Sequence, residues 1–225
     1  MAIAAKRTKT IMARRQDLIQ ATIKSIATEG YSNSTVQTIC DAAGLSRGLI
    51  SHYFKGKDDL LLEVFRHLVA EADEDTRQAV RAVGDDPMQR LLAATESAFK
   101  RPKESRENSM VSLAYWGTAP WNPQMLDLYH KLWRRYRIWV RRMIEQAAAQ
   151  RGLEIDADRA ALTYTQLVDG FWLGWLMDKD AYSPDDAISI IRDWVLDLFE
   201  ESPKTKRKPA TKAVRATTRQ KSVRG

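Results

Sequence analysis

Apolar residues recur along most of the chain at intervals of three and four positions, which is the spacing of one face of an α-helix. An early case is the stripe Ile19, Ile23 and Ile26, and it is followed by Gly30, a residue type that favours a helix end. No segment shows the sustained alternation of apolar and polar residues that a half-buried strand requires. The pattern predicts an all-α fold.

Glycines and prolines divide this pattern into separate helices. A proline lacks the amide proton that an interior helical turn needs, so Pro120, Pro123 and Pro184 mark helix starts or breaks. The run Gly84-Asp85-Asp86-Pro87 ends a long apolar stripe in the same way. We expect about nine helices, over residues 12–29, 35–42, 46–53, 57–82, 87–100, 105–118, 123–151, 157–178 and 184–200.

The two short helices near the N-terminus have the form of a helix-turn-helix. Gly44 lies between them and permits a tight turn, while the hydroxyl groups of Thr35 and Ser46 can each cap the helix that follows. In such a motif the first helix packs on the core and the second lies in the major groove of DNA. The residues expected to face inward are Val36, Ile39, Cys40, Leu45, Leu49, Ile50 and Phe54.

The remaining positions of this segment face outward and carry groups that bind nucleic acid. Arg47 can contact guanine with two hydrogen bonds or hold a phosphate, and Lys57 can meet the DNA backbone. Our candidate DNA-binding residues are Thr35, Ser46, Arg47, Gly48, Ser51, His52, Tyr53 and Lys57.

The segment TVQTICDAAGLSRGLISHYFKGKDDL, residues 35–60, resembles the head of the tetracycline-repressor (TetR) family of bacterial regulators. The aromatic pair Tyr53-Phe54 followed by Lys57 and Leu60 carries the resemblance, although Cys40 stands where alanine is usual. The resemblance implies a three-helix DNA-binding head and a C-terminal helical domain for ligand binding and dimerisation. It also implies a homodimer on a double-stranded DNA operator and a small-molecule inducer.

The chain accordingly divides into four parts. We expect a basic N-terminal arm at 1–11, a helix-turn-helix domain at 12–56, an effector-binding and dimerisation domain at 57–201, and a disordered basic tail at 202–225. The tail has almost no large apolar residue, so burial cannot offset the entropy lost on ordering it.

Aromatic residues are concentrated in the second half of the chain. Tryptophans at helical spacing commonly do no more than fill a core, yet several indoles near a carboxylate also form a wall that holds an organic cation. Residues 112–126 and 167–175 resemble the choline-sensing repressors of glycine betaine synthesis, a branch of the same family. Asp169 is the acid within the second, otherwise apolar segment, where it must pair with a protein group, cap a helix or meet a cationic ligand. Our candidate ligand-binding residues are Tyr115, Trp116, Trp121, Asp169 and Trp172.

The last two expected helices carry apolar stripes for which the sequence offers no obvious intrachain partner. In the TetR family such helices pair across a two-fold axis as a four-helix bundle. The residues expected at a dimer interface are Leu162, Gln166, Leu173, Leu176, Ile188, Ile191, Val195 and Leu198.

Charge and composition narrow the function classes. The chain has a net charge of +7, but residues 16–200 hold 22 basic and 28 acidic residues, so the basicity belongs to the two ends. These ends either engage nucleic acid or an anionic surface, or are merely solvated. A single cysteine excludes an internal disulfide and a multi-thiolate metal site. We expect a cytoplasmic protein with no membrane span, no metal and no cofactor.

The alternatives are of three kinds. An enzyme is disfavoured, because the chain has three histidines, no recognisable nucleophile and base at a fitting spacing, and no glycine-rich phosphate loop. An architectural nucleic-acid protein would bind through its basic tails alone. A third alternative keeps the repressor and replaces the cationic inducer with an apolar, drug-like molecule.

Overall fold

The computed structural model of the chain describes residues 2–44, 48 and 54–200. Within these ranges every regular element is helical, which confirms the predicted all-α class, and eight of the nine expected helices are present. The expected helix at 46–53 lies outside the described residues except for Gly48, which is helical. The elements are α1 (Ala2–Glu29), α2 (Val36–Ala43), α4 (Lys57–Ala82), α5 (Pro87–Glu104), α6 (Arg106–Thr118), the 3₁₀ turn η1 (Ala119–Trp121), α7 (Pro123–Arg151), α8 (Ala157–Met177) and α9 (Pro184–Leu198).

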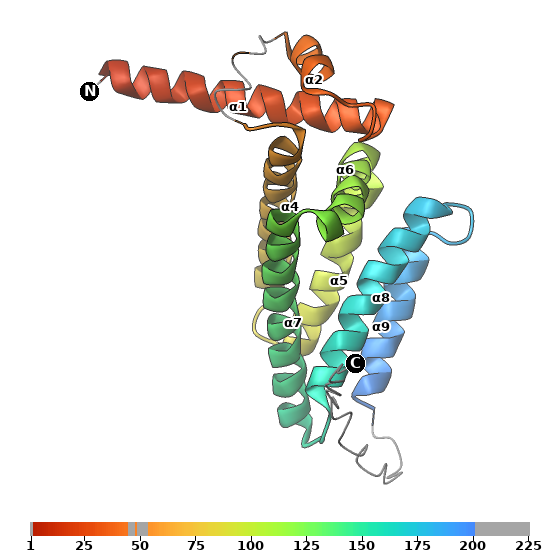
Figure 1. Ribbon diagram of the computed structural model, residues 1–225. Coiled ribbons are helices and arrows are strands. Elements are labelled where there is room, and N and C mark those ends of the chain that lie inside the picture. The colour runs from red at the N-terminus through yellow and green to blue at the C-terminus, as the bar shows by residue number, and fades with distance from the viewer. Residues whose placement is uncertain (1, 45–47, 49–53, 201–225) are drawn as a thin grey trace, which may run out of the picture.

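The helices form a bundle with a head across one end (Figure 1). α1 lies across that end with α2 packed on it, and α4 leads from the head down the length of the bundle. α5, α7, α8 and α9 run alongside, and the shorter α6 reaches up to contact α1.

α1 buries the predicted isoleucine stripe, with Ile19, Ile23 and Ile26 all nearly inaccessible. Gly30 ends the helix at a left-handed φ of 77°, and its N–H donates to the carbonyl oxygen of Ile26 at 3.0 Å. The helix begins at Ala2, ten residues before the predicted start, so the segment expected as an arm continues the helix. Its run of alanine, lysine, arginine and methionine, without glycine or proline, explains the extension through intrinsic propensity.

α2 is held by the cap that the sequence indicated. The Thr35 hydroxyl accepts from the Thr38 N–H while the Thr38 side chain accepts from the Thr35 N–H, which is a capping box. Gly44 adopts a left-handed φ of 63° and closes the helix. Ile39 and Cys40 are buried, as predicted.

α7 and α9 begin at prolines, as predicted. Pro123 follows Asn122, whose side chain accepts from the N–H groups of the first turn of α7. Pro184 follows Ser183, which forms a capping box with Asp186. A proline tolerates this position because the first-turn amide has no intrahelical partner in any case.

One buried cluster joins the head to the bundle. Phe65 of α4 and Tyr115 of α6 stack with ring centroids 3.6 Å apart and planes 6° apart, and the Tyr115 hydroxyl donates to the Met125 carbonyl oxygen. Nearer the surface, Lys57 Nζ donates to the Tyr31 carbonyl oxygen at 2.8 Å. The Tyr31 hydroxyl also donates to Asp58. We use the name head–body joint for the region that holds these contacts, formed by Tyr31, Lys57, Asp58, Phe65 and Tyr115.

A second buried cluster fills the part of the bundle remote from the head. It draws on α5, α7, α8 and α9, with Phe99, Ile144, Tyr164 and Ile191 among its fully covered members. The first cluster therefore spans the head and the adjoining part of the bundle, and the second fills the remote part of the bundle.

Candidate ligand cavity and DNA-binding head

A cavity of about 690 Å³ lies among five helices of the bundle. Its lining residues come from α4, α5, α6, α7 and α8. Its apolar wall includes Leu68, Val69, Ala72, Val80, Ala94, Ala98 and Leu132. This volume falls in the range of about 300–1,000 Å³ that is typical of small-molecule pockets.

Three tryptophans from three different helices meet at one part of the wall. The Trp116 ring of α6 lies with its centroid 5.8 Å from that of Trp133 of α7 and 4.9 Å from that of Trp172 of α8. The Tyr129 ring stacks on Trp133 with the two ring centroids 4.3 Å apart. Together with Asp169 of α8, these three tryptophans form what we call the aromatic end of the cavity.

Asp169 supplies a carboxylate to this aromatic end. Its Oδ2 accepts a hydrogen bond of 2.6 Å from Trp133 Nε1, and no arginine or lysine of the described residues lies within ion-pair distance of it. Burial raises the pKa of the Asp169 carboxyl from 3.8 to about 6, although the Trp133 hydrogen bond and the charge of Arg137 act in the opposite direction. At neutral pH the Asp169 carboxylate is therefore largely ionised, and the neutral N–H of Trp133 satisfies its negative charge only in part.

Trp116 adds an unused donor to the same end. Its Nε1 is buried and has no hydrogen-bond partner among the described residues. An unpaired buried N–H costs about 1–3 kcal/mol, which a ligand oxygen placed against it would offset. The aromatic end thus offers ring faces, a carboxylate and one N–H donor.

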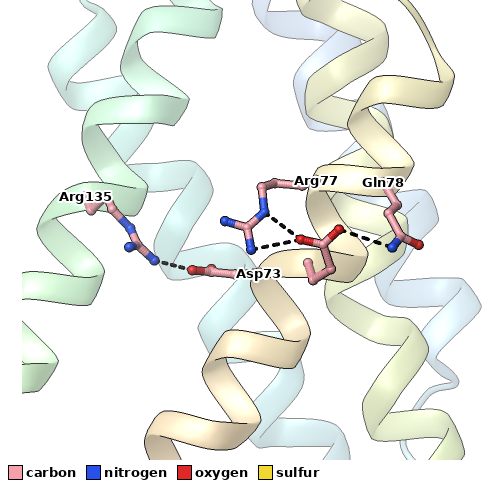
Figure 2. A network of polar contacts seen from close by, with 5 residues as sticks. Asp73, Arg77, Gln78 and Arg135 are labelled. Carbon is pink, nitrogen blue, oxygen red and sulfur yellow. Dashed lines mark hydrogen bonds and ion pairs between the residues drawn. The ribbon is translucent and has the colours of Figure 1, made fainter. Parts of the chain in front are cut away.

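Arginines gather further along α4. Arg77 donates to Glu74 through Nε at 3.1 Å and through Nη2 at 3.0 Å. Arg135 of α7 donates to Asp73 (Figure 2). Beyond them, Arg81 and Arg90 line the cavity on either side of the turn between α4 and α5. We call Arg81 and Arg90 the arginine end.

The structure brings together three of the five predicted ligand residues, Trp116, Asp169 and Trp172. Tyr115 is fully buried in the head–body joint, because consecutive residues of a helix face different directions. Trp121 lies on η1 and is 87% exposed, away from the cavity. These two positions are corrections to the sequence-based prediction.

Sequence reasoning missed three aromatic residues of α7 that line the cavity, namely Trp133, Tyr136 and Trp139. The available signal was the run of aromatic residues at positions 129, 133 and 136, which share one helical face. Nothing in the sequence indicated that this face meets Asp169.

Five of the eight predicted DNA-binding residues lie outside the described residues, namely Ser46, Arg47, Ser51, His52 and Tyr53. Thr35 is exposed and caps α2, and Gly48 is exposed and helical. Lys57 is only partly exposed, since its amine contacts the carbonyl of Tyr31 and lies 4.2 Å from the centroid of that ring. An ammonium group has three donors, so the contact with Tyr31 leaves others for a phosphate.

The residues predicted for a dimer interface divide into two groups. Leu162, Gln166 and Leu173 of α8 are exposed and Leu176 is partly so. Ile191 and Val195 of α9 are instead fully buried in the second core, and Ile188 and Leu198 pack against it. The α9 stripe therefore has an intrachain partner, since it faces α5 and α8, and this corrects the prediction. The exposed apolar residues of α9 are Ile190 and Leu196.

Two kinds of feature are absent from the part of the chain that the structure describes. There, no helix combines the length and the apolar character needed to cross a bilayer. The same residues contain no group of three or more histidine, cysteine, aspartate or glutamate side chains placed to hold a metal ion.

Comparison with known proteins agrees with this architecture. The family described as "Bacterial regulatory proteins, tetR family" matches residues 18–64, and the one described as "BetI-type transcriptional repressor, C-terminal" matches residues 87–200. The HTH-type transcriptional regulator BetI of Pseudomonas aeruginosa is 30% identical over 187 residues, covering 81% of this chain and 91% of its own. BetI of Yersinia pestis is 28% identical over 186 residues, with 81% and 90% covered.

Solved structures show the same likeness. A transcriptional regulator from Pseudomonas aeruginosa PAO1 superposes with a TM-score of 0.75 at 27% identity, covering 83% of this chain and 90% of that one. A regulator from Saccharomonospora viridis, solved in complex with choline, gives 0.72 at 28% identity, with 81% and 95% covered. The two family matches, the curated relatives and the helical architecture agree: this chain belongs to the TetR family of transcriptional regulators as a BetI-type repressor, and not to a family of enzymes.

Proposed function

We propose that the protein is a homodimeric repressor that binds a palindromic operator and is released from it by an organic cation, choline or another quaternary ammonium compound. The observation that carries the proposal is the placement of the Asp169 carboxylate beside the rings of Trp116, Trp133 and Trp172 in one wall of the cavity.

The chemistry of this wall suits a cation without N–H donors. A quaternary ammonium group cannot form a hydrogen-bonded ion pair, so it is held by ring faces, each contributing about 0.5–2 kcal/mol, and by a negative charge close to those rings. The Trp116 N–H is suited to a hydroxyl oxygen on the same ligand. The choline complex of the Saccharomonospora viridis regulator supports this class of ligand.

The exposed apolar residues of α8 and α9 support a dimer. Leu162 is 51% exposed, Ile190 48% and Leu196 41%, and a two-fold axis beside these helices would bury them against the same residues of a partner. Such a dimer would present two heads to successive major grooves about 34–36 Å apart. Ser46, Arg47, Ser51, His52 and Tyr53 remain our proposed DNA contacts in each head, with Thr35, Gly48 and Lys57 beside them.

Release follows from linkage between the cavity and the joint. Phe65 lines the cavity and also stacks on Tyr115 beneath the head. A ligand that favours a different position of α4 changes the spacing of the two heads, and it weakens operator binding by its difference in affinity for the two arrangements.

A ligand comparison tests the proposal. We would measure the melting temperature of the full chain with choline, with its uncharged carbon isostere (a tert-butyl group in place of trimethylammonium) and with planar aromatic drugs, since binding raises that temperature by mass action. We expect stabilisation by choline or a related quaternary ammonium compound and little by the isostere. Stabilisation by the isostere or the drugs alone would favour the apolar-inducer alternative and reject the cationic one.

A further inference from the structure

We infer that the cavity takes an elongated zwitterion, with a quaternary ammonium group at the aromatic end and a carboxylate or phosphate at the arginine end. The inference rests on the proposed cation site and specifies the class of ligand that completes it. It depends on the length of the cavity, on the charges of its lining and on the apolar side chains between its two ends.

The cavity is too long for a compact cation alone. On α4 its lining residues run from Phe65 to Arg81, which corresponds to about 24 Å at the rise of an α-helix. Trp116 and Trp133 pack against the cluster that contains Phe65 and Leu68, so the aromatic end lies at the start of this run. Arg81 lies thirteen residues beyond Leu68, about 20 Å further along the helix axis.

The charge of the lining is opposite to that expected for a simple cation site. Four arginines and two aspartates line the cavity: Arg77, Arg81, Arg90, Arg135, Asp73 and Asp169. A monocation at the aromatic end therefore shares the cavity with a net positive charge. An anionic group on the same molecule removes that mismatch.

Two of the four arginines already form ion pairs within the chain. Arg135 is paired with Asp73, and Arg77 grips Glu74 with two donors (Figure 2). Arg81 has no ion-pair partner among the described residues. Arg90 pairs with Asp85, but the Asp85 side chain is 98% exposed, so water screens that pair strongly.

Arg90 is also held in position. Its Nε donates to the Gly84 carbonyl oxygen at 2.7 Å, and its side chain is only 28% exposed. A guanidinium fixed in this way can present its remaining donors to a carboxylate or phosphate with little loss of side-chain entropy. Arg81 approaches from the last turn of α4, on the other side of the turn that contains Gly84.

The wall between the two ends carries apolar side chains on which a hydrocarbon chain can lie. The polar groups of this stretch are paired with each other, Thr76 with Ser97 at 3.1 Å and Arg135 with Asp73. Val69, Ala72 and Val80 of α4 line the cavity together with Ala94 and Ala98 of α5. These side chains offer no charge and no hydrogen bond, so methylene groups lie against them without leaving a polar group unpaired. The three zones together match a cation, a spacer and an anion in that order.

The test compares three ligands of equal chain length by isothermal titration of the full chain. One carries trimethylammonium and carboxylate at opposite ends, the second lacks the carboxylate and the third lacks the ammonium. With a spacer of about ten methylenes, we expect the zwitterion to bind at least about tenfold more tightly than either. A fourth ligand with a phosphate in place of the carboxylate shows, by its affinity relative to the carboxylate, which of the two anions the site prefers.

Substitutions of Arg81 and Arg90 test whether these two residues hold the anionic group of the ligand. Arg81→Ala combined with Arg90→Ala should lower zwitterion affinity about tenfold and leave choline affinity unchanged. Arg81→Lys keeps the positive charge and should retain part of the affinity that the terminal anion adds. Arg66→Ala is the matched control, because Arg66 is an exposed arginine of α4 that does not line the cavity. Circular dichroism confirms that each variant is folded.

The outcomes separate the two proposals. If no quaternary ammonium ligand binds, the proposed cation site is wrong. If choline and the alkylammonium bind but the terminal anion adds no affinity, or if the double arginine variant keeps the full affinity for the zwitterion, the cation site stands and the zwitterion inference is overturned.

Discussion

The head–body joint and the ligand cavity adjoin each other on α4, yet they are built in opposite ways. At the joint, Tyr115 is fully buried and its ring lies flat on Phe65. One residue later, Trp116 lines an open cavity and keeps a buried N–H without a partner among the described residues. The joint is close-packed and the cavity is hollow.

The difference shows where a ligand can act. A close-packed region resists compression, so the contact beneath the head moves as a unit or not at all. The hollow region can instead accept a ligand of the proposed class without such a rearrangement. Phe65 belongs to both regions, so filling the cavity changes the surroundings of a ring on which the head rests.

The largest expected effect concerns the packed region. Tyr115→Ala removes a fully buried ring and should lower the free energy of unfolding by about 3–5 kcal/mol, as measured by urea denaturation. Trp121→Ala is the control, since this ring is 87% exposed and should change stability by less than about 0.5 kcal/mol. Equal losses from the two variants would contradict the division into packed and open regions.

The next effect concerns the hollow region. Asp169→Asn keeps an oxygen that can accept from Trp133 Nε1 but removes the charge, so choline affinity should fall by about 2 kcal/mol, or roughly thirtyfold. Operator affinity without ligand should stay the same, because α8 packs mainly on α5, α7 and α9 and not on the helices of the head. Titration calorimetry measures the first quantity and fluorescence anisotropy the second. Unaltered choline affinity would remove the carboxylate from the site.

The raised pKa of Asp169 predicts a pH dependence of ligand binding. Since that pKa is about 6, the carboxyl is largely ionised at neutral pH and largely protonated at about pH 5. Choline affinity should therefore fall about tenfold between about pH 7 and about pH 5, and the Asp169→Asn variant should show no such change. A fall of the same size in the variant would assign the dependence to another group.

The same pKa predicts the opposite trend for the ligand-free fold. A carboxyl whose pKa is raised from 3.8 to about 6 binds its proton more tightly in the folded state than in the unfolded chain. Its contribution to stability is greatest below about pH 4 and is lost as the pH rises through about 6. At neutral pH, Asp169→Asn should thus raise the melting temperature of the unliganded protein while weakening choline binding.

The smallest expected effect tests the connection between the regions. Phe65→Leu keeps an apolar side chain but removes the ring that stacks on Tyr115. We expect folding and choline binding to persist while the coupling between choline and operator falls by about 0.5–2 kcal/mol. The coupling is the ratio of operator affinities with and without choline. Full coupling in this variant would mean that the signal travels by another route.

The two regions also differ in how far sequence alone predicts them. Ile19, Ile39 and Gly44 were placed correctly because local spacing and turn chemistry determine burial and helix ends. Trp133 and Arg90 were missed, because the cavity forms where five helices meet and no local pattern records which faces approach. The buried Ile191 shows the same limit, since an apolar stripe does not state whether its partner lies in the same chain.

The most direct test of the account is reciprocal titration of choline and operator. A palindromic duplex selected from a random library would be titrated with the full chain, with and without saturating choline, and choline would be titrated with and without the duplex. The account predicts that choline weakens duplex binding, typically about 5–150-fold, and that the duplex weakens choline binding by the same factor. Choline that binds tightly while duplex affinity stays constant would contradict it.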